Sequence, residues 1–439
     1  MHTMRIPAQN VKSADKRPGL FRGPGGKSLL LTFTLVTTLF LLWGFCNGML
    51  DILNKHFQTT LHINKFESGF VQTANYLAYF LLAIPAGLLA RRFGYKAGII
   101  TGLVLIASGA FWFVPATRIG TYWAFLSGVF VVGAGMACLE TIANPYTTVL
   151  GPAESSATRI NIAQTFNGLG WILGPIVGGH FVFSKINGVD ANGSLYIPYL
   201  GTGIVVAVLI GIFTLAYIPD MSAEEEVTAE VEGKGKKPLW LRLHFTLGVL
   251  AQFLYVAAQA GIFSFFINYV LENAHGVTPE QASSWLGMFG FGLFMVGRLW
   301  GSGVVSVTRP DRALAVYAML NAVLCGLVMA GGKTGLCSLF GTFFFMSIMY
   351  PTIFALSIRG LGEHTKLGSS LIVMSIVGGA IAPPLMGHIA DVSSMRLGFV
   401  IPLACFGLIA LYGASWRVLE SRDRTVTAGT RFPAPDSKT

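Results

Sequence analysis

The sequence predicts an all-α integral membrane protein with twelve transmembrane helices in two six-helix repeats. Three observations support this fold class: the scarcity of charge, the number of long apolar runs, and a Gly/Pro pattern that recurs in the second half. Only 11% of the 439 residues are charged and 53% are hydrophobic, whereas a soluble domain carries roughly 25% charged residues. This composition excludes an ordinary soluble enzyme, a disordered protein and a secreted disulfide scaffold.

Twelve apolar runs account for the expected helices. A membrane-spanning helix needs about 20 mostly apolar residues, and each run meets that length to within a few residues. The predicted spans are 29–57, 67–90, 97–117, 122–150, 159–183, 196–218, 243–271, 282–307, 313–331, 335–358, 367–390 and 397–418.

Polar segments divide the chain into five parts. Residues 1–28 are predicted to be a retained cytoplasmic N-terminal tail, because the apolar run that follows is too long for a signal-peptide core and has no small-residue cleavage pattern. We expect an N-terminal six-helix bundle at 29–218, a solvated cytoplasmic linker at 219–242, a C-terminal six-helix bundle at 243–418 and a cytoplasmic C-terminal tail at 419–439.

The distribution of Lys and Arg predicts the orientation in the membrane. With a cytoplasmic N-terminus, all but six of the 30 basic side chains fall on segments that lie inside, as the positive-inside rule requires. Both termini are therefore expected in the cytoplasm. The net charge of +10 is explained by this orientation, so we expect no nucleic-acid partner. The six outside residues are Lys55, Lys65, Arg118, Lys185, Lys333 and Arg396.

The five cysteines predict neither a disulfide framework nor a metal site. All of them lie inside apolar runs, and the sequence contains no CxxC pair or His/Cys cluster. We expect no metal and no cofactor. The cysteines are Cys46, Cys138, Cys325, Cys337 and Cys405.

The repeat is visible in the fifth and eleventh spans. Four residue pairs share one offset of 208 positions, and in both halves the preceding span contains a polar residue followed by proline. Two parallel six-helix repeats are the plan of the major facilitator transporters, in which the substrate binds near the midplane between the halves. The four pairs are Gly170/Gly378, Pro175/Pro383, Gly179/Gly387 and His180/His388.

Away from the helix ends, Asp51 and Glu140 are the two acids within the apolar runs. Inserting an Asp at the centre of a membrane helix costs roughly 2.5–3.5 kcal/mol on insertion scales. The presence of two such acids therefore requires an explanation. They either bind protons that are coupled to transport or form structural hydrogen bonds between helices. We favour proton coupling for the pair, because burial disfavours the charged carboxylate and brings protonation within reach of a proton gradient.

Amides and aromatic residues in the same spans fit a polyhydroxylated ligand. Amides donate and accept hydrogen bonds, as sugar hydroxyls require, and an aromatic ring packs against the apolar face of a sugar. Each residue alone is more readily explained by helix packing, but the set predicts a polar central cavity. The candidates for substrate binding are Asn47, Asn144, Gln164, Asn167, Gln259, Asn268, Trp43 and Tyr350.

Six segments between about Leu29 and Trp416 resemble the fucose–galactose–glucose proton-symporter family. The resemblance implies a major facilitator fold and proton-driven sugar uptake across a bacterial inner membrane. It also implies that Asp51 and Glu140 are the functional carboxylates, and that Gln164 and Asn167 belong to the sugar site. The segments are LLWGFCNGMLDIL, IPAGLLARRFGYKAGIITGL, CLETIANPYTTVLGP, RINIAQTFNGLG, FLYVAAQAGIFSF and FMSIMYPTIFALSIRGLGEHTKLGSSLIVMSIVGG.

The sequence departs from the family pattern at Gly48 and Leu50, where fucose-transporting members carry amides near the acid. The sugar therefore stays open among fucose, glucose, galactose and a related hexose such as N-acetylglucosamine. We expect a monomeric, multi-pass protein of the cell inner (plasma) membrane, whose partners are a monosaccharide, protons and the lipid bilayer.

The leading hypothesis is a proton-coupled monosaccharide symporter that works by alternating access and is not an enzyme. A second hypothesis is an uncoupled sugar facilitator or a proton-driven efflux antiporter. A membrane enzyme acting on lipid-linked sugars needs a metal-binding acidic loop or a large outer domain, and neither is visible in the sequence. A sugar sensor needs a signalling domain, for which the predicted tails are short.

Overall fold

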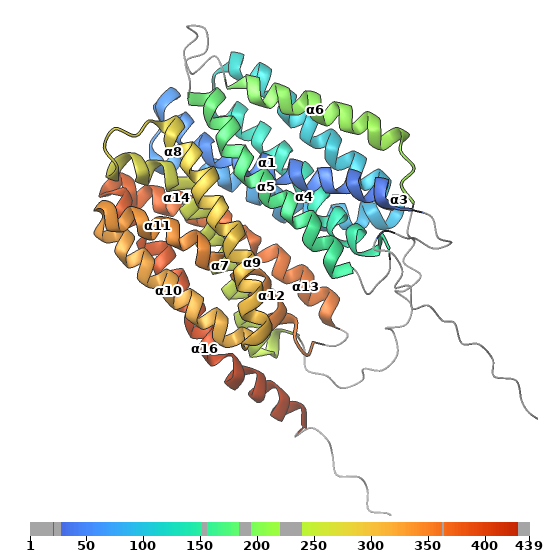
Figure 1. Ribbon diagram of the computed structural model, residues 1–439, viewed down its shortest axis with the longest axis vertical. Coiled ribbons are helices and arrows are strands. Elements are labelled where there is room, and N and C mark those ends of the chain that lie inside the picture. Colours follow the sequence, from blue (N-terminus) through green and yellow to red (C-terminus); the bar gives the residue numbers. More distant parts are fainter. Residues whose placement is uncertain are drawn as a thin grey trace, which may run out of the picture.

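The computed structural model is built of helices (Figure 1). It describes residue 21 and residues 28–151, 156–183, 195–219, 239–361 and 364–428. These ranges contain no strand, and eleven of their helical segments are long and apolar enough to cross a membrane. The all-α membrane fold is thus confirmed. Most of the predicted N-terminal tail, most of the linker and the last part of the C-terminal tail lie outside the described residues.

The first half contains the helices that the apolar runs predict, with one difference in how they are joined. Its elements are α1 (Leu30–Thr60), α2 (Lys65–Ser68), α3 (Phe70–Ile119), α4 (Tyr122–Val149), α5 (Ser156–Phe183) and α6 (Tyr196–Leu215). The long α3 contains two predicted spans, which meet at Gly94, where the backbone has a non-helical φ of 84°. Glycine adopts positive φ without steric penalty, so the chain turns here. Counting α3 as two helices gives the twelve predicted spans.

The second half contains helices that are more often interrupted. Its elements are η5 (Leu239–Leu241), α7 (Leu243–Asn273), α8 (Pro279–Trp285), η6 (Leu286–Phe291), α9 (Gly292–Val307), α10 (Pro310–Ala330), α11 (Gly332–Met346), α12 (Met349–Ile358), α13 (Thr365–Met374), η8 (Ser375–Val377), α14 (Gly378–Val392), α15 (Met395–Gly398) and α16 (Val400–Ala428). The segment η6 is π-helical and joins α8 to α9. Helix α16 extends ten residues beyond its predicted end, so the predicted C-terminal tail begins as helix.

Glycines bring the backbones of α1 and α5 into direct contact. A Cβ atom added to Gly44 would lie 2.0 Å from the carbonyl oxygen of Asn167, and one added to Gly170 would lie 2.3 Å from that of Leu41. Small residues at helix interfaces allow such close approach in membranes. Since no side chain separates the two backbones at these glycines, the relative position of the helices is tightly defined there.

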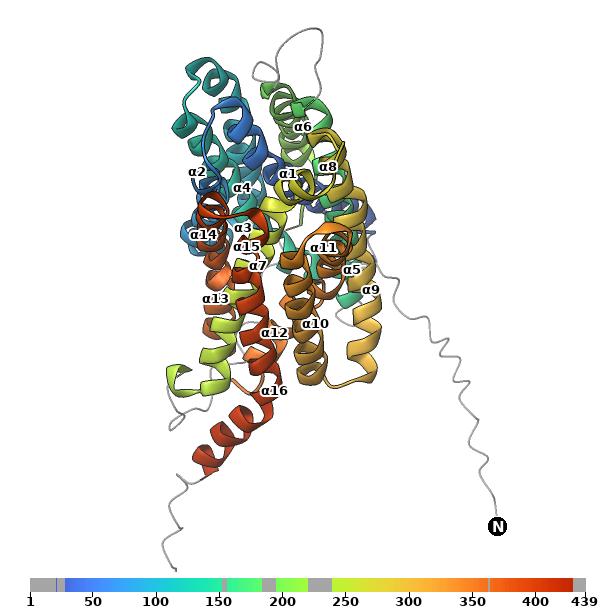
Figure 2. The same cartoon turned by 90° about the vertical axis from the view of Figure 1, so that its left-hand side faces the viewer.

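The two halves of the chain meet at one end of the molecule, near α8 and α14, and their helices diverge from there (Figure 1). We call this the Lys65 end; there α1, α5, α7 and α14 end, and α2 and α8 begin. The opposite end, where α1, α5 and α7 begin, is called the Arg91 end. Figure 2 shows α2 beside α14 in the side view.

Polar contacts join the halves at the Lys65 end. The backbone N–H groups of Lys65 and Phe66 donate to the Asp391 carboxylate at 3.1 and 2.8 Å. The Lys65 ammonium lies 2.9 Å from a carboxylate oxygen of Glu272, and the Ser283 hydroxyl donates to the carbonyl oxygen of Pro175 at 2.6 Å. The structure is therefore closed at the Lys65 end.

Candidate functional site

Asp51 lies buried between α1 and α3. Its side chain is 3% exposed, and the Gln72 amide donates to its Oδ1 atom at 2.8 Å. Its Oδ2 atom accepts no hydrogen bond from the residues that the structure describes. If Asp51 were ionised, its Oδ2 atom would have lost its hydrogen bonds to water and gained none from the protein, which costs free energy.

Polar residues continue from Asp51 along one face of α1 toward the Lys65 end. Asn54 and Gln58 follow at spacings of three and seven residues, which place them on the same helix face. Gln58 accepts a hydrogen bond from the Asn268 amide of α7 at 2.6 Å and donates one to Ser68 at 2.8 Å. We call this face of α1, from Asp51 to Gln58, the polar seam; its contact with the second half is the bond between Gln58 and Asn268.

Glu140 has different surroundings, although it also lies in the first half. It is only partly buried on α4, and no hydrogen bond or ion pair to its carboxylate occurs among the described residues. Asn144, four residues on, lies on the same face of α4 and contacts Gln164 of α5. One turn beyond Gln164, a Cβ atom on Gly168 would lie 3.2 Å from Met295 of the second half.

Tyr76 lies on the same face of α3 as Gln72, which donates to Asp51. Its ring lies 6.4 Å from that of Tyr79, centroid to centroid. Tyr76 also lies against the second half, because a Cβ atom on Gly379 of α14 would be 2.5 Å from its ring. Tyr76 therefore lies at the boundary between the halves, on the face of α3 that also carries Gln72.

Two of the predicted amides lie beside Glu140. The Asn144 side chain donates to the Glu140 carbonyl oxygen at 3.1 Å and accepts from the Gln164 amide at 3.2 Å. Both amides are partly exposed. The structure thus brings together one acid and two amides from α4 and α5, a set that can donate to and accept from a hydroxylated ligand.

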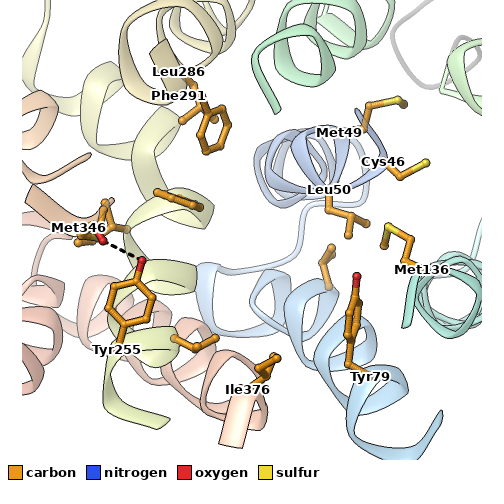
Figure 3. Close-up of a cluster of buried hydrophobic side chains, with 14 of the residues drawn as sticks. Cys46, Met49, Leu50, Tyr79, Met136, Tyr255, Leu286, Phe291, Met346 and Ile376 are labelled. Atoms are coloured by element: carbon orange, nitrogen blue, oxygen red, sulfur yellow. Dashed lines mark hydrogen bonds between the residues drawn. The ribbon is translucent and has the colours of Figure 1, made fainter. Parts of the chain in front are cut away.

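Asn167, Asn47 and Trp43 are held more tightly by the first half. The Asn167 amide is 4% exposed and donates to the Phe40 carbonyl oxygen at 3.2 Å. The Asn47 amide donates to the Trp43 carbonyl oxygen at 3.0 Å. The Trp43 indole N–H donates to the Tyr79 hydroxyl at 2.7 Å, and Figure 3 shows that hydroxyl pointing toward α1 and Leu50. These side chains have hydrogen-bond partners within the protein.

The predicted residues of the second half lie in two places. The ring of Tyr350 lies 6.2 Å from that of Tyr255, centroid to centroid, and the Tyr255 hydroxyl donates to the Met346 carbonyl oxygen at 3.0 Å (Figure 3). Gln259 follows Tyr255 by one helical turn and is partly buried. Asn268 is different: it is 2% exposed and contacts Gln58 in the seam, so its side chain lies at the contact between α1 and α7.

Sequence reasoning did not select Gln72, Tyr76 and Tyr79, of which Gln72 donates to Asp51 and Tyr79 accepts from Trp43. All three lie on α3, at spacings of four and three residues. Such spacing places them on one helix face, so a search for polar stripes within the predicted span 67–90 would have found them.

Comparisons with known proteins agree with this geometry. The family model of the Major Facilitator Superfamily matches residues 33–376. The L-fucose-proton symporter of Escherichia coli (strain K12) is 37% identical over 436 residues, covering 94% of this chain and 98% of that protein. A glucose/galactose transporter of Brucella abortus is 34% identical over 392 residues, covering 88% and 94%. The crystal structure of the transporter FucP in the outward conformation has a TM-score of 0.64 and 37% identity, covering 88% of this chain and 99% of FucP.

Proposed function

The chain belongs to the Major Facilitator Superfamily, and from this premise we propose that it is a proton-coupled symporter that imports a monosaccharide by alternating access. The observation that carries the proposal is the pair of carboxylates within the membrane-spanning helices, Asp51 and Glu140, of which Glu140 adjoins the Asn144–Gln164 pair. The similarity to an L-fucose-proton symporter and to a glucose/galactose transporter supports a hexose or 6-deoxyhexose as substrate.

The proposal includes an orientation. The Lys65 end faces outward and the Arg91 end faces the cytoplasm, supported by the excess of Lys and Arg on the segments at the Arg91 end. The two bundles are 29–218 and 243–418, both termini are cytoplasmic, and the protein works as a monomer in the inner membrane. It has no enzymatic activity in this proposal.

Closure at the Lys65 end gives Asp51 a role in coupling. In this closed structure Asp51 is buried, and one of its carboxylate oxygens has no partner among the described residues. An ionised Asp51 would destabilise this closed state, whereas a protonated one is tolerated. Closing the outer side is therefore favoured after Asp51 has bound a proton, and a deprotonated Asp51 favours reopening.

Glu140 has the complementary role at the sugar. It adjoins Asn144 and Gln164, and it has no protein partner for its carboxylate among the described residues. It is therefore available to hydroxyl groups of a sugar between the halves. At 100 mV, one proton moving inward supplies about 2.3 kcal/mol, enough for roughly fifty-fold accumulation at one proton per sugar.

Uptake into proteoliposomes tests this function. We expect labelled L-fucose, D-glucose, D-galactose or N-acetylglucosamine to accumulate when the outside is acidic, and a protonophore to abolish the accumulation. Adding the transported sugar should make a weakly buffered external medium alkaline. Equilibration without accumulation would indicate a facilitator, and acidification of the medium would indicate an antiporter.

A further inference from the structure

Three aromatic side chains join the two halves between the amide pair and the Lys65 end. The ring centroid of Trp171, on α5, lies 4.9 Å from that of Phe291 and 5.8 Å from that of Phe263. Phe263 and Phe291, from α7 and η6, lie 4.9 Å apart with their planes at 86°. We call these three residues the aromatic roof.

The helical position of Trp171 places it between the proposed sugar site and the Lys65 end. It follows Gln164 by seven residues and Asn167 by four, so it lies on the same side of α5, one to two turns nearer the Lys65 end. The next turn contains Pro175, whose carbonyl oxygen accepts the bond from Ser283 that joins the halves. The roof thus lies between the amides and the closed end.

The backbone around Trp171 is held by close contacts on both sides. A Cβ atom on Gly48 of α1 would lie 2.8 Å from the Trp171 carbonyl oxygen, and one on Gly287 would lie 2.5 Å from the carbonyl oxygen of Ile172. Gly287 belongs to the π-helical segment η6, which also carries Phe291. Single π-helical turns are frequent at functional sites.

In the aromatic roof, Phe263 and Phe291 of the second half are buried, whereas Trp171 has a polar N–H group available to a ligand. Phe263 is 4% exposed and Phe291 is 2% exposed, and Phe263 stacks on Phe343 at 4.9 Å. Trp171 is partly buried, and its indole N–H donates no bond for which an acceptor appears among the described residues. Figure 3 shows Phe291 across from the turn of α1 that carries Cys46, Met49 and Leu50.

We propose that Trp171 is a specificity-determining residue that stacks on the apolar C–H face of the sugar ring and, with Phe263 and Phe291, closes the sugar site toward the Lys65 end. This inference rests on the proposed sugar transport. An indole offers a flat apolar surface together with one N–H donor, which suits a ring that has an apolar face and hydroxyl groups at its edge. Since Trp171 and the two Phe residues come from different halves, the roof parts when the halves separate at that end.

The first experiment measures selectivity in Trp171→Leu, Trp171→Phe and the control Trp123→Leu, whose side chain is 75% exposed. L-fucose and D-galactose are compared with their alditols, which keep the hydroxyl groups but lack the ring. We expect Trp171→Leu to raise the KM for the transported sugar at least tenfold and to change alditol competition less than twofold. Trp171→Phe should have a smaller effect on the KM, and the pH profile of uptake should be unchanged in all variants. A wild-type KM in correctly inserted Trp171→Leu protein overturns the proposal.

The second experiment measures closure and needs no sugar. The exposed Cys337 is replaced by Ser, and Gly168→Cys is introduced, where the new Cβ atom would lie 3.2 Å from the flexible Met295 side chain. A membrane-impermeant thiol reagent is added outside. We expect Trp171→Ala to speed labelling of position 168 at least fivefold and Trp123→Leu to leave it unchanged; equal rates in Trp171→Ala overturn the proposal. If wild-type protein transports no sugar, the proposed function fails, and this labelling still tests the roof.

Discussion

Asp51 and Glu140 are both carboxylates within membrane-spanning helices of the first half, but their surroundings differ. Asp51 is 3% exposed, has one hydrogen-bond donor in Gln72, and belongs to a seam that joins the halves through Gln58 and Asn268. Glu140 is partly exposed and adjoins the Asn144–Gln164 pair. The difference teaches that two acids in one bundle can have quite different surroundings. In the mechanism proposed above, Asp51 responds to closure of the outer side and Glu140 responds to the sugar.

Replacing Asp51 gives the sharpest test of this comparison. Asp51→Asn keeps the size of the side chain and imitates a permanently protonated acid. We expect it to abolish sugar accumulation and sugar-dependent alkalinisation while sugar binding persists, because the seam then closes without a proton. The measurements are uptake against a sugar gradient and equilibrium binding in proteoliposomes. Glu67→Gln, at an exposed carboxylate of the Lys65 end, is the control; continued concentrative uptake by Asp51→Asn would show that Asp51 is a structural acid.

A smaller effect is expected from Glu140→Gln. The substitution leaves the seam intact but changes a group beside the sugar, so the sugar KM and its pH dependence should change while exchange of sugar for sugar survives. A loss of one charged hydrogen bond corresponds to about 1.5–3 kcal/mol, or a KM change of roughly tenfold or more. Counterflow at several pH values measures both properties. If Glu140→Gln and Asp51→Asn behave identically in counterflow and in binding, the two acids do not have separate tasks.

Substitutions of the two amides on α5, Gln164 and Asn167, should have a still smaller effect, mainly on sugar affinity. Gln164→Ala removes a partly exposed amide that faces Asn144, and a lost neutral hydrogen bond is worth about 1 kcal/mol net. We expect a KM increase of about fivefold, with uptake still proton-dependent. Asn167→Ala should weaken affinity too, and should also lower thermal stability because its amide bonds the Phe40 carbonyl oxygen of α1. Unchanged KM in both variants would remove these residues from the site.

The smallest effect is expected at the Lys65 end. Asp391→Ala removes the carboxylate that accepts the N–H groups of Lys65 and Phe66, and should loosen the closed state. Since Asp391 is exposed, water replaces part of the lost interaction, and we expect a twofold to threefold change in the uptake rate with unchanged sugar affinity in binding assays. Asp391→Asn retains one acceptor oxygen, so its uptake rate should lie between those of the wild-type protein and Asp391→Ala. An altered affinity would mean that this contact belongs to the sugar site.

Several features of the fold follow from local sequence alone. The twelve spans could be predicted because the length of an apolar run must match the thickness of the bilayer, and the break at Gly94 separates two runs that the sequence already keeps apart. Asp51 and Glu140 could be selected because an acid in an apolar run is costly and therefore rare. The π-helical turn at Leu286–Phe291 and the interruption at Ser375–Val377 could not be predicted, because they depend on contacts with other helices.

The sequence by itself thus determined which helices exist, which polar residues they carry, and the family to which the chain is similar. Only the tertiary structure decided which of those residues meet: Gln164 with Asn144, Asn268 with Gln58 of the other half, and Trp171 with Phe263 and Phe291. The physical reason is that hydropathy depends on each residue and its near neighbours, whereas the rotation of a helix about its axis depends on long-range packing. The contact of Gly44 with the Asn167 backbone is one such constraint, and it joins residues more than a hundred positions apart.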